Sequence, residues 1–450
     1  MSLVIGEYHE YTVTRKEATC REKLVGAFYG YVLELAVDQR QQTAGHLALR
    51  RVWDCPDLDF LTSPTSYTFR HPGSGHSGFM TPVDGLKLTG KLWFDENDIR
   101  TWRVVGGAPA WTGYTDTYEG TQGQQRRELA NVLCHACGQW WFDMDGGWYD
   151  DPRMMAEIAQ LRAIADRSLA WDRSPVDEVA VIVDDASFNY LLPGNRLSPP
   201  LVLEQILELA RLGAPVGYYT LDDLDRLPPK KMMLFLNSIA PTEAHRLAIE
   251  QLKSDGRMLL WVYAPGLYRD GQLDEAAMHE LTGMPLRLHH ETALLKVECR
   301  HHALPTVIYG AEEPVAPFAV ADDARAEVWG TLADSGLPGL AVRSFAQWTS
   351  VFSSAPALPA RLLRFLAQQA GVHLYLESSP DSHDIVYGNR SLLALCVDAP
   401  GPRTIRLPDP GDVYDLFADR SVGAGLCEFT VEMARHETKL WHIGGEHRSS

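Results

Sequence analysis

The pattern of apolar and polar positions in the first third of the chain alternates between strands and helices. Short apolar runs predict strands at residues 3–10, 23–31, 58–64, 86–94 and 138–145. Apolar residues at helical spacing predict helices over residues 42–52, 124–134 and 152–167. Polar loops follow the strands, the longest at residues 71–84 and 106–123. This order is typical of a (β/α) barrel, in which the loops after the strands line the active site.

The rest of the chain has two further patterns. Residues 175–372 alternate continuous apolar strands with helices, which predicts a doubly wound, mostly parallel sheet. Residues 373–450 carry short alternating runs divided by Pro, Gly and Asp, which predict a small antiparallel β-sandwich. We therefore predict an α/β multidomain protein with a barrel-like domain at residues 1–174, a doubly wound domain at 175–372 and a β-sandwich at 373–450.

Composition narrows the classes of partner. The 450 residues are 45% hydrophobic and carry a formal net charge of −18, which argues against a nucleic-acid partner. No apolar run reaches the roughly 18 residues that span a bilayer, and the N-terminus lacks a secretory signal pattern. Seven scattered cysteines are typical of free thiols in a reducing compartment. We expect a cytoplasmic protein that acts without membrane or nucleic acid.

Aromatic residues gather at the predicted strand ends of the first domain. Sugars present flat C–H faces and a rim of hydroxyls, so their sites combine aromatic platforms with carboxylates and amides. We therefore expect a small carbohydrate as the substrate. Its predicted binding residues are Tyr29, Tyr67, Arg70, Trp93, Asn97, Arg100, Trp141, Asp143 and Trp148.

Glycoside hydrolysis needs two carboxylic groups, and Glu96 is the first candidate because it follows the apolar residues 86–94 directly. Asn97 and Arg100 beside it are expected to keep it ionised as a nucleophile. Glu10 and Glu34 each follow a predicted strand, and either is a candidate for the acid/base. The alternative reading of Glu96 is a solvated turn after a strand.

Other motifs favour structural roles. Cys134 and Cys137 have CxxC spacing without a second pair, so buried thiols at a helix end are favoured over zinc or redox chemistry. Asp143, Asp145 and Asp151 lack the terminal glutamate of a calcium loop, and Asp151 more simply caps a helix. No phosphate-binding glycine motif follows Asp184 and Asp185, so the doubly wound domain is read as structural or oligomerising. We expect no metal and no cofactor.

Three segments carry a family resemblance: residues 60–67 (FLTSPTSY), 90–101 (GKLWFDENDIRT) and 140–149 (WWFDMDGGWY). They resemble the ends of the sixth, seventh and eighth barrel strands of a clan-A glycoside hydrolase of the family-42 β-galactosidase type. The resemblance implies a flavodoxin- or amidotransferase-like trimerisation domain and a C-terminal β-sandwich after the barrel. It also implies a retaining, exo-acting enzyme for β-galactosides or related small sugars, with the nucleophile on Glu96.

The chain departs from this family at its start. An eight-stranded barrel usually takes about 250 residues, whereas residues 1–174 hold only four or five predicted strands. The Asn-Glu pair that carries the family's acid/base has only His9-Glu10 as a stand-in. An open half-barrel leaves an apolar face exposed, so we expect a homo-oligomer, dimer or trimer, to cover it. The competing reading is a non-catalytic carbohydrate-binding or assembly protein on a degenerate barrel.

Overall fold

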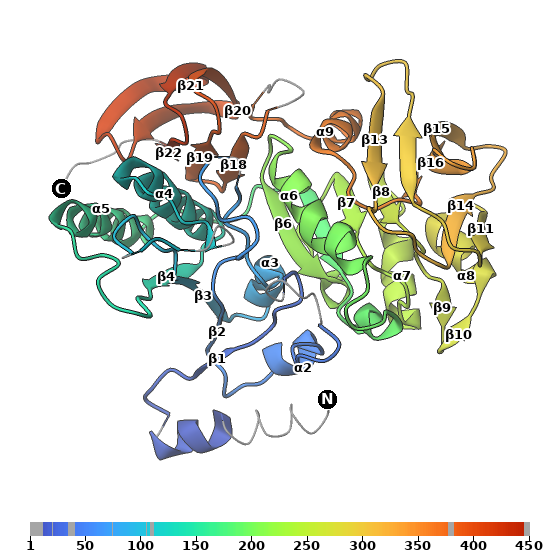
Figure 1. Cartoon of the computed structure of the whole chain (residues 1–450), viewed down its shortest axis with the longest axis horizontal. Coiled ribbons are helices and arrows are strands. Elements are labelled where there is room, and N and C mark those ends of the chain that lie inside the picture. The colour runs from blue at the N-terminus through green and yellow to red at the C-terminus, as the bar shows by residue number, and fades with distance from the viewer. Residues whose placement is uncertain are drawn as a thin grey trace.

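The chain folds into three units, each built around its own sheet (Figure 1). The computed structural model describes residues 12–19, 21–34, 41–73, 75–104, 106–108, 112–376 and 382–444. The first unit has a four-stranded parallel sheet, the second a nine-stranded mixed sheet and the third a five-stranded antiparallel sheet. The predicted α/β multidomain organisation with a C-terminal antiparallel sheet is confirmed at this level. The predicted strand at residues 3–10 lies outside the described residues.

The strands of the first unit lie in chain order and all run in parallel, as barrel strands do. They are β1 (Gly26–Phe28), β2 (Phe60–Thr62), β3 (Leu92–Asn97) and β4 (Gly138–Trp141). The helices between and after them are α2 (Leu49–Trp53), α3 (Val83–Lys87), α4 (Tyr118–Cys134) and α5 (Pro152–Ser168), and residues 12–18 are also helical. Each parallel strand therefore presents its carboxyl end at the same edge of the sheet.

The predicted strand over residues 86–94 is wrong in its first half. Val83 and Leu86 are one helical turn apart and lie buried on α3, which begins after Pro82. Gly90 has a left-handed backbone (φ 77°) and separates the helix from β3. The strand begins only at Leu92 and continues through Glu96 to Asn97. The glutamate is therefore part of the strand, and its position is fixed by the sheet.

Two helices of this unit start at other residues than predicted. The helix predicted from residue 42 starts only at Leu49, whereas α4 starts earlier than predicted, at Tyr118, because the Thr117 hydroxyl accepts the Gly120 N–H (3.1 Å). The prediction for α5 is confirmed, including its cap: the Asp151 carboxylate accepts the Arg153 N–H (2.9 Å). Caps give local signals that apolar periodicity alone misses.

The second unit is a mixed sheet with strand order β13-β12-β15-β16-β17-β8-β7-β5-β6. Its parallel part comprises β5 (Val179–Val183), β6 (Val216–Thr220), β7 (Met232–Phe235), β8 (Arg257–Val262) and β17 (Trp348–Ser353). Its antiparallel part comprises β12 (Lys296–Cys299), β13 (Val307–Gly310), β15 (Glu327–Leu332) and β16 (Pro338–Ser344). No element was predicted between residues 264 and 358, where most of the strands are only four to seven residues long.

Shorter elements surround this sheet. The α-helices are α6 (Glu204–Ala210), α7 (Glu243–Leu252), α8 (Glu275–Thr282) and α9 (Ala360–Gln369). A π-helical segment, η3 (Pro199–Leu203), and two 3₁₀ helices, η2 (Ala186–Tyr190) and η4 (Leu221–Asp223), complete the set. Two small antiparallel pairs join β9 (Tyr268–Arg269) to β10 (Gln272–Leu273) and β11 (Leu286–His289) to β14 (Phe318–Ala321). The sequence predicts helices at residues 200–212, 242–254 and 359–370 of this domain. All three are confirmed, with the first one split between η3 and α6.

The third unit is one sheet with strand order β18-β19-β22-β20-β21, rather than the two separate sheets of a sandwich. Its strands are β18 (Ile385–Gly388), β19 (Leu392–Cys396), β20 (Gly401–Asp415), β21 (Arg420–Met433) and β22 (Thr438–Ile443). Register shifts between Arg406 and Tyr414 interrupt the long β20–β21 ladder, and both strands arch over in Figure 1. A bent sheet thereby encloses a small core without a second sheet.

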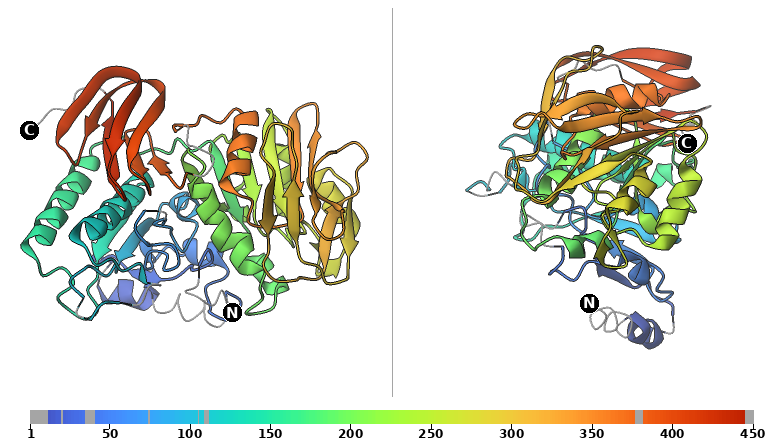
Figure 2. Two further views of the ribbon diagram at one scale, coloured as in Figure 1. Left: turned by 45° about the horizontal axis from the view of Figure 1, so that its top comes forward. Right: turned by 90° about the vertical axis from the view of Figure 1, so that its right-hand side faces the viewer.

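The second and third units both dock on the helical side of the first one (Figure 2). Helix α3 packs against β6, and α4 packs against β18, β19 and β22. Hydrogen bonds join the units: the Asp185 carboxylate accepts the Leu49 N–H (2.9 Å), and the Asp84 carboxylate accepts the Tyr218 N–H (2.9 Å). No helix among the described residues is both long and apolar enough to cross a bilayer.

Candidate active site

The two faces of β3 carry different chemistry. Because side chains alternate along a strand, Phe94 and Glu96 lie on one face, and Trp93, Asp95 and Asn97 lie on the other. Phe94 packs edge-on against Phe60 of β2, with ring centroids 6.0 Å apart. This face is turned away from the helices and we call it the open face, defined by Phe28, Phe60, Leu92, Phe94 and Trp140.

Glu96 stands at the carboxyl end of the open face. Its backbone is tied to two neighbouring strands: it pairs with Trp140 of β4, and its N–H donates to the Ser63 carbonyl (2.9 Å). The residue is 6% exposed. Burial, together with the nearby Asp98 carboxylate, raises the pKa of Glu96 to about 7, and the Arg70 guanidinium opposes this rise. A carboxyl with this pKa changes charge at neutral pH, as groups in catalytic sites often do.

Arg70 is the cation of this site and is fully buried. Its guanidinium forms an ion pair with Asp98 (Nη1–Oδ1 2.7 Å) and donates to the carbonyls of Thr65 (2.6 Å) and Ser66 (3.1 Å). It also lies over the ring of Tyr67, 4.3 Å from the centroid, and the Tyr67 hydroxyl donates to Asp98 (3.2 Å). The loop after β2 and the end of β3 are therefore held together by one charged network.

Glu34 approaches the same network from the segment after β1. Its Oε1 accepts hydrogen bonds from the Thr68 N–H (3.0 Å) and the Thr68 hydroxyl (2.7 Å). Burial raises the pKa of Glu34, while hydrogen bonds from Ser66 and Thr68 and the charge of Arg70 lower it. The structure thus brings together Glu34, Tyr67, Arg70 and Glu96 from the predicted set. Glu10 lies outside the described residues.

A second carboxyl pair, Asp95 and Glu128, lies behind β3 and was not among the predicted site residues. Both are buried, and the hydroxyl of Thr65 donates to Asp95 (2.8 Å). Burial and the neighbouring Glu128 raise the pKa of Asp95 to about 8, and burial raises that of Glu128. Asp95 was visible as part of the charged segment after the apolar run, but no sequence signal connects it with Glu128 on α4, 33 positions later.

Four predicted sugar-binding residues point away from the open face. Trp93 is fully buried and its indole donates to Asp95 (3.0 Å), whereas Asn97 exchanges hydrogen bonds with Gln125 of α4 (2.8 and 3.3 Å). Trp141 donates to the same Gln125 (2.8 Å), and Tyr29 is buried with its hydroxyl bonded to the Leu47 carbonyl. The expectation that Asn97 holds Glu96 ionised is therefore corrected, because alternation along β3 places the two side chains on opposite faces.

The remaining predicted residues shape the loop after β4. The Asp143 carboxylate accepts the N–H groups of Gly146 (2.7 Å) and Trp148 (2.9 Å), so it closes a turn. Trp148 is only 2% exposed, and the Arg100 guanidinium lies 4.9 Å from its ring centroid. In this arrangement Trp148 is not an open sugar platform, in contrast to its predicted position. It anchors the loop to the segment that follows β3.

Comparisons with known proteins add a fold-level relationship. Protein-family models and curated proteins gave no match. Among solved structures, a catalytic mutant of a GH42 β-galactosidase from G. stearothermophilus matches with 12% identity and a TM-score of 0.65, over 98% of this chain and 66% of that chain. A β-galactosidase from Halorubrum lacusprofundi matches with 14% identity and a TM-score of 0.66, also over 98% and 66%. The chain resembles the family-42 β-galactosidases in fold.

This glycosidase-like fold extends to other enzymes. An α-L-fucosidase from Paenibacillus thiaminolyticus matches with 11% identity and a TM-score of 0.52, over 82% of this chain and 64% of that chain. The chain spans about two thirds of the length of the β-galactosidases named above. The expected resemblance is confirmed for the fold.

The other candidate motifs of the sequence have structural roles. Cys134 ends α4, both CxxC thiols are buried, and burial raises the pKa of Cys137 to about 12. Asp184 follows β5 at a point where doubly wound sheets bind ligands, but here it accepts a hydrogen bond from Ser187. Asp185 is used to cap the start of α2. The barrel-like unit therefore occupies this crevice itself.

Proposed function

We propose that the chain is a retaining glycoside hydrolase, exo-acting on β-galactosides or related small sugars, with Glu96 as the nucleophile. The observation that carries the proposal is the position of Glu96. It is fixed by the sheet at the carboxyl end of a parallel strand, on the face where barrel enzymes place their chemistry. Its pKa of about 7 leaves a substantial ionised fraction at neutral pH.

In the proposed reaction, the ionised Glu96 carboxylate attacks the anomeric carbon and a carboxylic acid protonates the leaving oxygen. Water then cleaves the glycosyl–enzyme ester, assisted by the same acid/base. Arg70 lowers the pKa of Glu96 and so favours the ionised form needed for attack. Glu34 and Glu10 remain the proposed candidates for the acid/base, and Glu34 has the raised pKa that a proton donor needs. No cofactor enters this mechanism.

A non-catalytic carbohydrate-binding or assembly protein is the second candidate. The observation that favours it is the number of groups that already contact the Arg70 guanidinium, namely Asp98, Tyr67 and two backbone carbonyls. Trp93 and Trp148, expected as sugar platforms, are buried. In that case the Arg70 network would stabilise the fold of a degenerate barrel and would not take part in catalysis.

Covalent trapping separates the two candidates. Incubation with an activated 2-deoxy-2-fluoro-β-galactoside, followed by peptide mass spectrometry, should find one added glycosyl group on the peptide that contains Glu96. Glu157→Gln is the matched control, since Glu157 is also a buried glutamate but pairs with Arg126 on the helical side (2.6 Å). Labelling of Glu96 in this variant and in the wild type supports the hydrolase. A folded wild type that acquires no label, or a label on another carboxylate, contradicts the assignment.

A further inference from the structure

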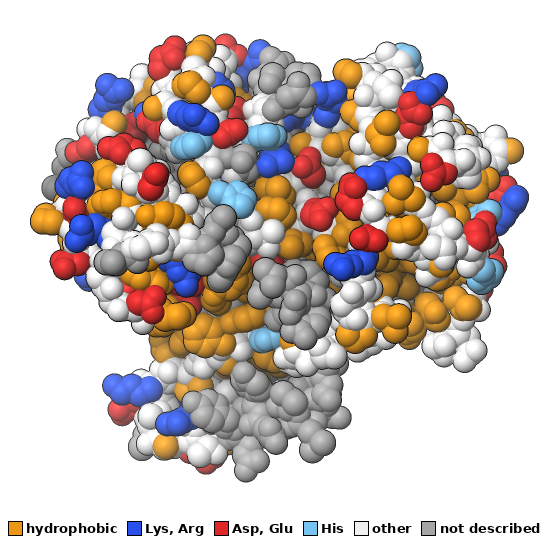
Figure 3. Space-filling view, in the orientation of Figure 1, with side chains coloured by type: hydrophobic (Ala, Val, Ile, Leu, Met, Phe, Trp, Pro, Cys, Tyr) orange, Lys and Arg blue, Asp and Glu red, His pale blue; other side chains and the backbone are white. Residues whose placement is uncertain are grey.

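A cavity lies beside β4, between this strand and the helices α4 and α5. Its volume is about 540 Å³. Small-molecule sites in proteins have volumes of about 300–1,000 Å³, so the cavity is large enough for one small ligand. On the face of the molecule that Figure 3 shows, hydrophobic side chains gather over β3 and β4. The cavity therefore lies in an apolar part of the first unit.

The helices supply an apolar wall to this cavity. Its aliphatic side chains are Leu129, Val132 and Leu133 of α4, Ile158 of α5, and Leu169 at the end of α5. The three side chains from α4 are almost fully buried, whereas Leu169 is 70% exposed. Burial of apolar surface is favourable, so this wall is suited to the apolar part of a ligand.

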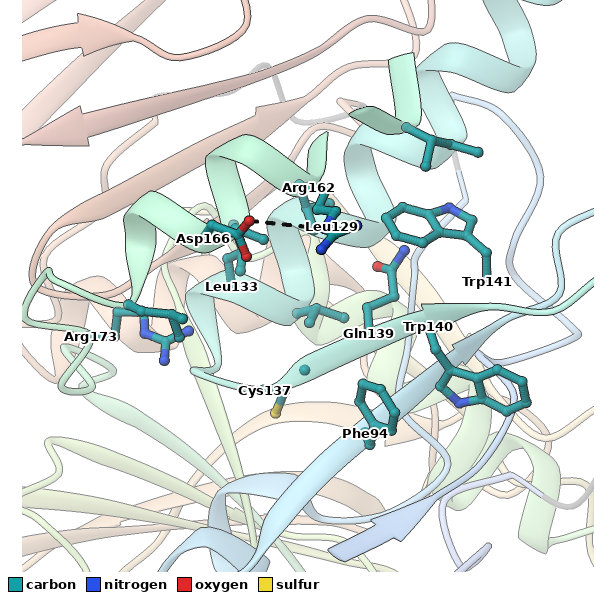
Figure 4. A pocket seen from close by; sticks show the side chains of 15 residues that line it. Phe94, Leu129, Leu133, Cys137, Gln139, Trp140, Trp141, Arg162, Asp166 and Arg173 are labelled. Atoms are coloured by element: carbon teal, nitrogen blue, oxygen red, sulfur yellow. Dashed lines mark ion pairs between the residues drawn. The ribbon is translucent and has the colours of Figure 1, made fainter. Parts of the chain in front are cut away.

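One polar group points into the cavity, the side-chain amide of Gln139. Figure 4 shows this side chain directed from β4 toward α4 and α5. Both Oε1 and Nε2 are buried, and neither has a hydrogen-bond partner in the part of the chain that the structure describes. Buried polar groups in proteins are almost always hydrogen-bonded. The amide of Gln139 therefore has a donor and an acceptor available to a bound molecule.

The neighbouring amide on α4 shows what a structural glutamine looks like in this unit. The Gln125 Oε1 accepts hydrogen bonds from the Asn97 amide (2.8 Å) and the Trp141 indole (2.8 Å). Its Nε2 donates to the Asn97 Oδ1 (3.3 Å). Gln125 thus joins α4 to β3 and β4. The amide of Gln139 makes no such connection, so its role is better explained by a ligand than by packing.

We propose that this cavity binds a neutral small molecule with an apolar body and a carboxamide group, and that Gln139 pairs with that carboxamide. Two carboxamides form a ring of two N–H···O hydrogen bonds, so one ligand group satisfies both Oε1 and Nε2. A carboxylate has no hydrogen to donate to Oε1, and a hydrocarbon satisfies neither atom. The apolar body lies against the leucine side chains of α4.

This site is separate from the one around Glu96 and does not rest on the proposed function. In the sheet, Glu96 pairs with Trp140 and Asp95 pairs with Gln139. Because side chains alternate along a strand, Gln139 points to the helical side and Trp140 to the other side, as Figure 4 shows. A ligand on Gln139 therefore does not compete with a substrate on Glu96, and its binding is measurable without a known reaction.

Titration of the full chain with naphthalene-2-carboxamide tests the proposal. The fluorescence of the naphthalene ring reports binding, which should saturate with a Kd of about 1 mM or tighter for a ligand of this size. The matched probe is 2-acetylnaphthalene, which has nearly the same shape but carries a methyl group in place of the amide nitrogen and its hydrogens. The wild type should bind the amide about tenfold more tightly than the ketone, because only the amide donates to Gln139.

Three variants locate the binding. Gln139→Leu should bind the two probes equally well, and it should melt no lower than the wild type because it removes an unpaired buried amide. Ala165→Phe, on the α5 wall, should weaken both probes at least about tenfold by filling the cavity. Gln251→Leu is the control, since Gln251 is exposed on α7 outside the cavity, and it should keep the wild-type preference. Circular dichroism should show that all four proteins are folded.

Four results would overturn the proposal. A folded wild type that binds neither probe shows that the cavity holds water only. Equal binding of the two probes by the wild type, or a preference for the amide that survives Gln139→Leu, shows that Gln139 does not pair with the ligand. A Gln139→Leu variant that melts below the wild type shows that the amide supports the fold instead.

Discussion

At the residue scale, Glu96 is held at a cost to folding. Its pKa is about 7 in the folded chain and 4.5 in an ordinary solvated glutamate, so the folded state binds the proton more tightly than the unfolded state. The contribution of this group to the free energy of unfolding therefore falls as pH rises from about 4.5 to about 7. Catalytic sites often contain a carboxyl group whose raised pKa lowers the free energy of unfolding, because the reaction needs a group that titrates near neutral pH. A purely structural role does not require such a pKa.

Arg70 is the residue on which the local charge balance depends. Replacing it with Met keeps much of its volume but leaves Asp98 buried without a cation, which should lower the free energy of unfolding by about 3–5 kcal/mol. Urea denaturation at pH 7 measures this change. Arg162→Met is the control, because the Arg162–Asp166 pair is exposed and should contribute at most about 1 kcal/mol. Equal effects of the two substitutions would show that Arg70 is not the centre of the network.

At the element scale, the sequence predicts the type of the long elements well and their limits poorly. Continuous apolar runs predict strands at residues 178–185 and 257–263, which are β5 and β8, and a long helical period predicts α5. Residues 86–94 fail because Leu86, Leu88 and Leu92 fit a strand by spacing, while Pro82 and Gly90 are the signals that divide them into a helix and a strand. The open face and its pairings depend on tertiary contacts, which no local pattern records.

Gly90 provides a direct test of that division. Its left-handed backbone (φ 77°) is strained for any residue with a Cβ, although no atom lies within 4 Å of the position a Cβ would take. Gly90→Ala should therefore destabilise the chain by about 1 kcal/mol, and Gly90→Asn by less, since Asn tolerates this conformation. Thermal melting of the two variants checks the order. An alanine variant as stable as the wild type would mean that the helix and strand are not divided at Gly90.

The sequence also predicts the site in part: it finds residues at strand ends but not the face on which each side chain lies. Glu34, Tyr67, Arg70 and Glu96 come together because each lies at or after the carboxyl end of a parallel strand, a position that the sequence pattern predicts. Trp93 and Asn97 were misplaced because the start of β3 was set too early and the alternation of its faces was not used. Which face a strand residue occupies depends on the packing of the helices behind it, here α4.

At the scale of the whole molecule, the second and third units lie on the helical side of the first sheet. The nine-stranded sheet and the bent C-terminal sheet both dock on helices α3 and α4. Glu96 lies at the carboxyl end of β3 in this four-stranded sheet. The fold resembles that of the family-42 β-galactosidases over 98% of this chain while covering 66% of theirs. The assignment of a reaction therefore depends on Glu96 itself.

The most direct measurement is hydrolysis of an aryl β-galactoside, within a panel of aryl glycosides, by the wild type and by Glu96→Gln across pH 5–9. As the nucleophile must be ionised, kcat/KM of the wild type should fall as pH drops through about 7. Glu96→Gln should lose at least about a thousandfold at every pH, whereas Glu157→Gln should retain activity. Equal rates for the wild type and Glu96→Gln, or no hydrolysis by a folded wild type, would contradict the assignment of Glu96 as the catalytic nucleophile.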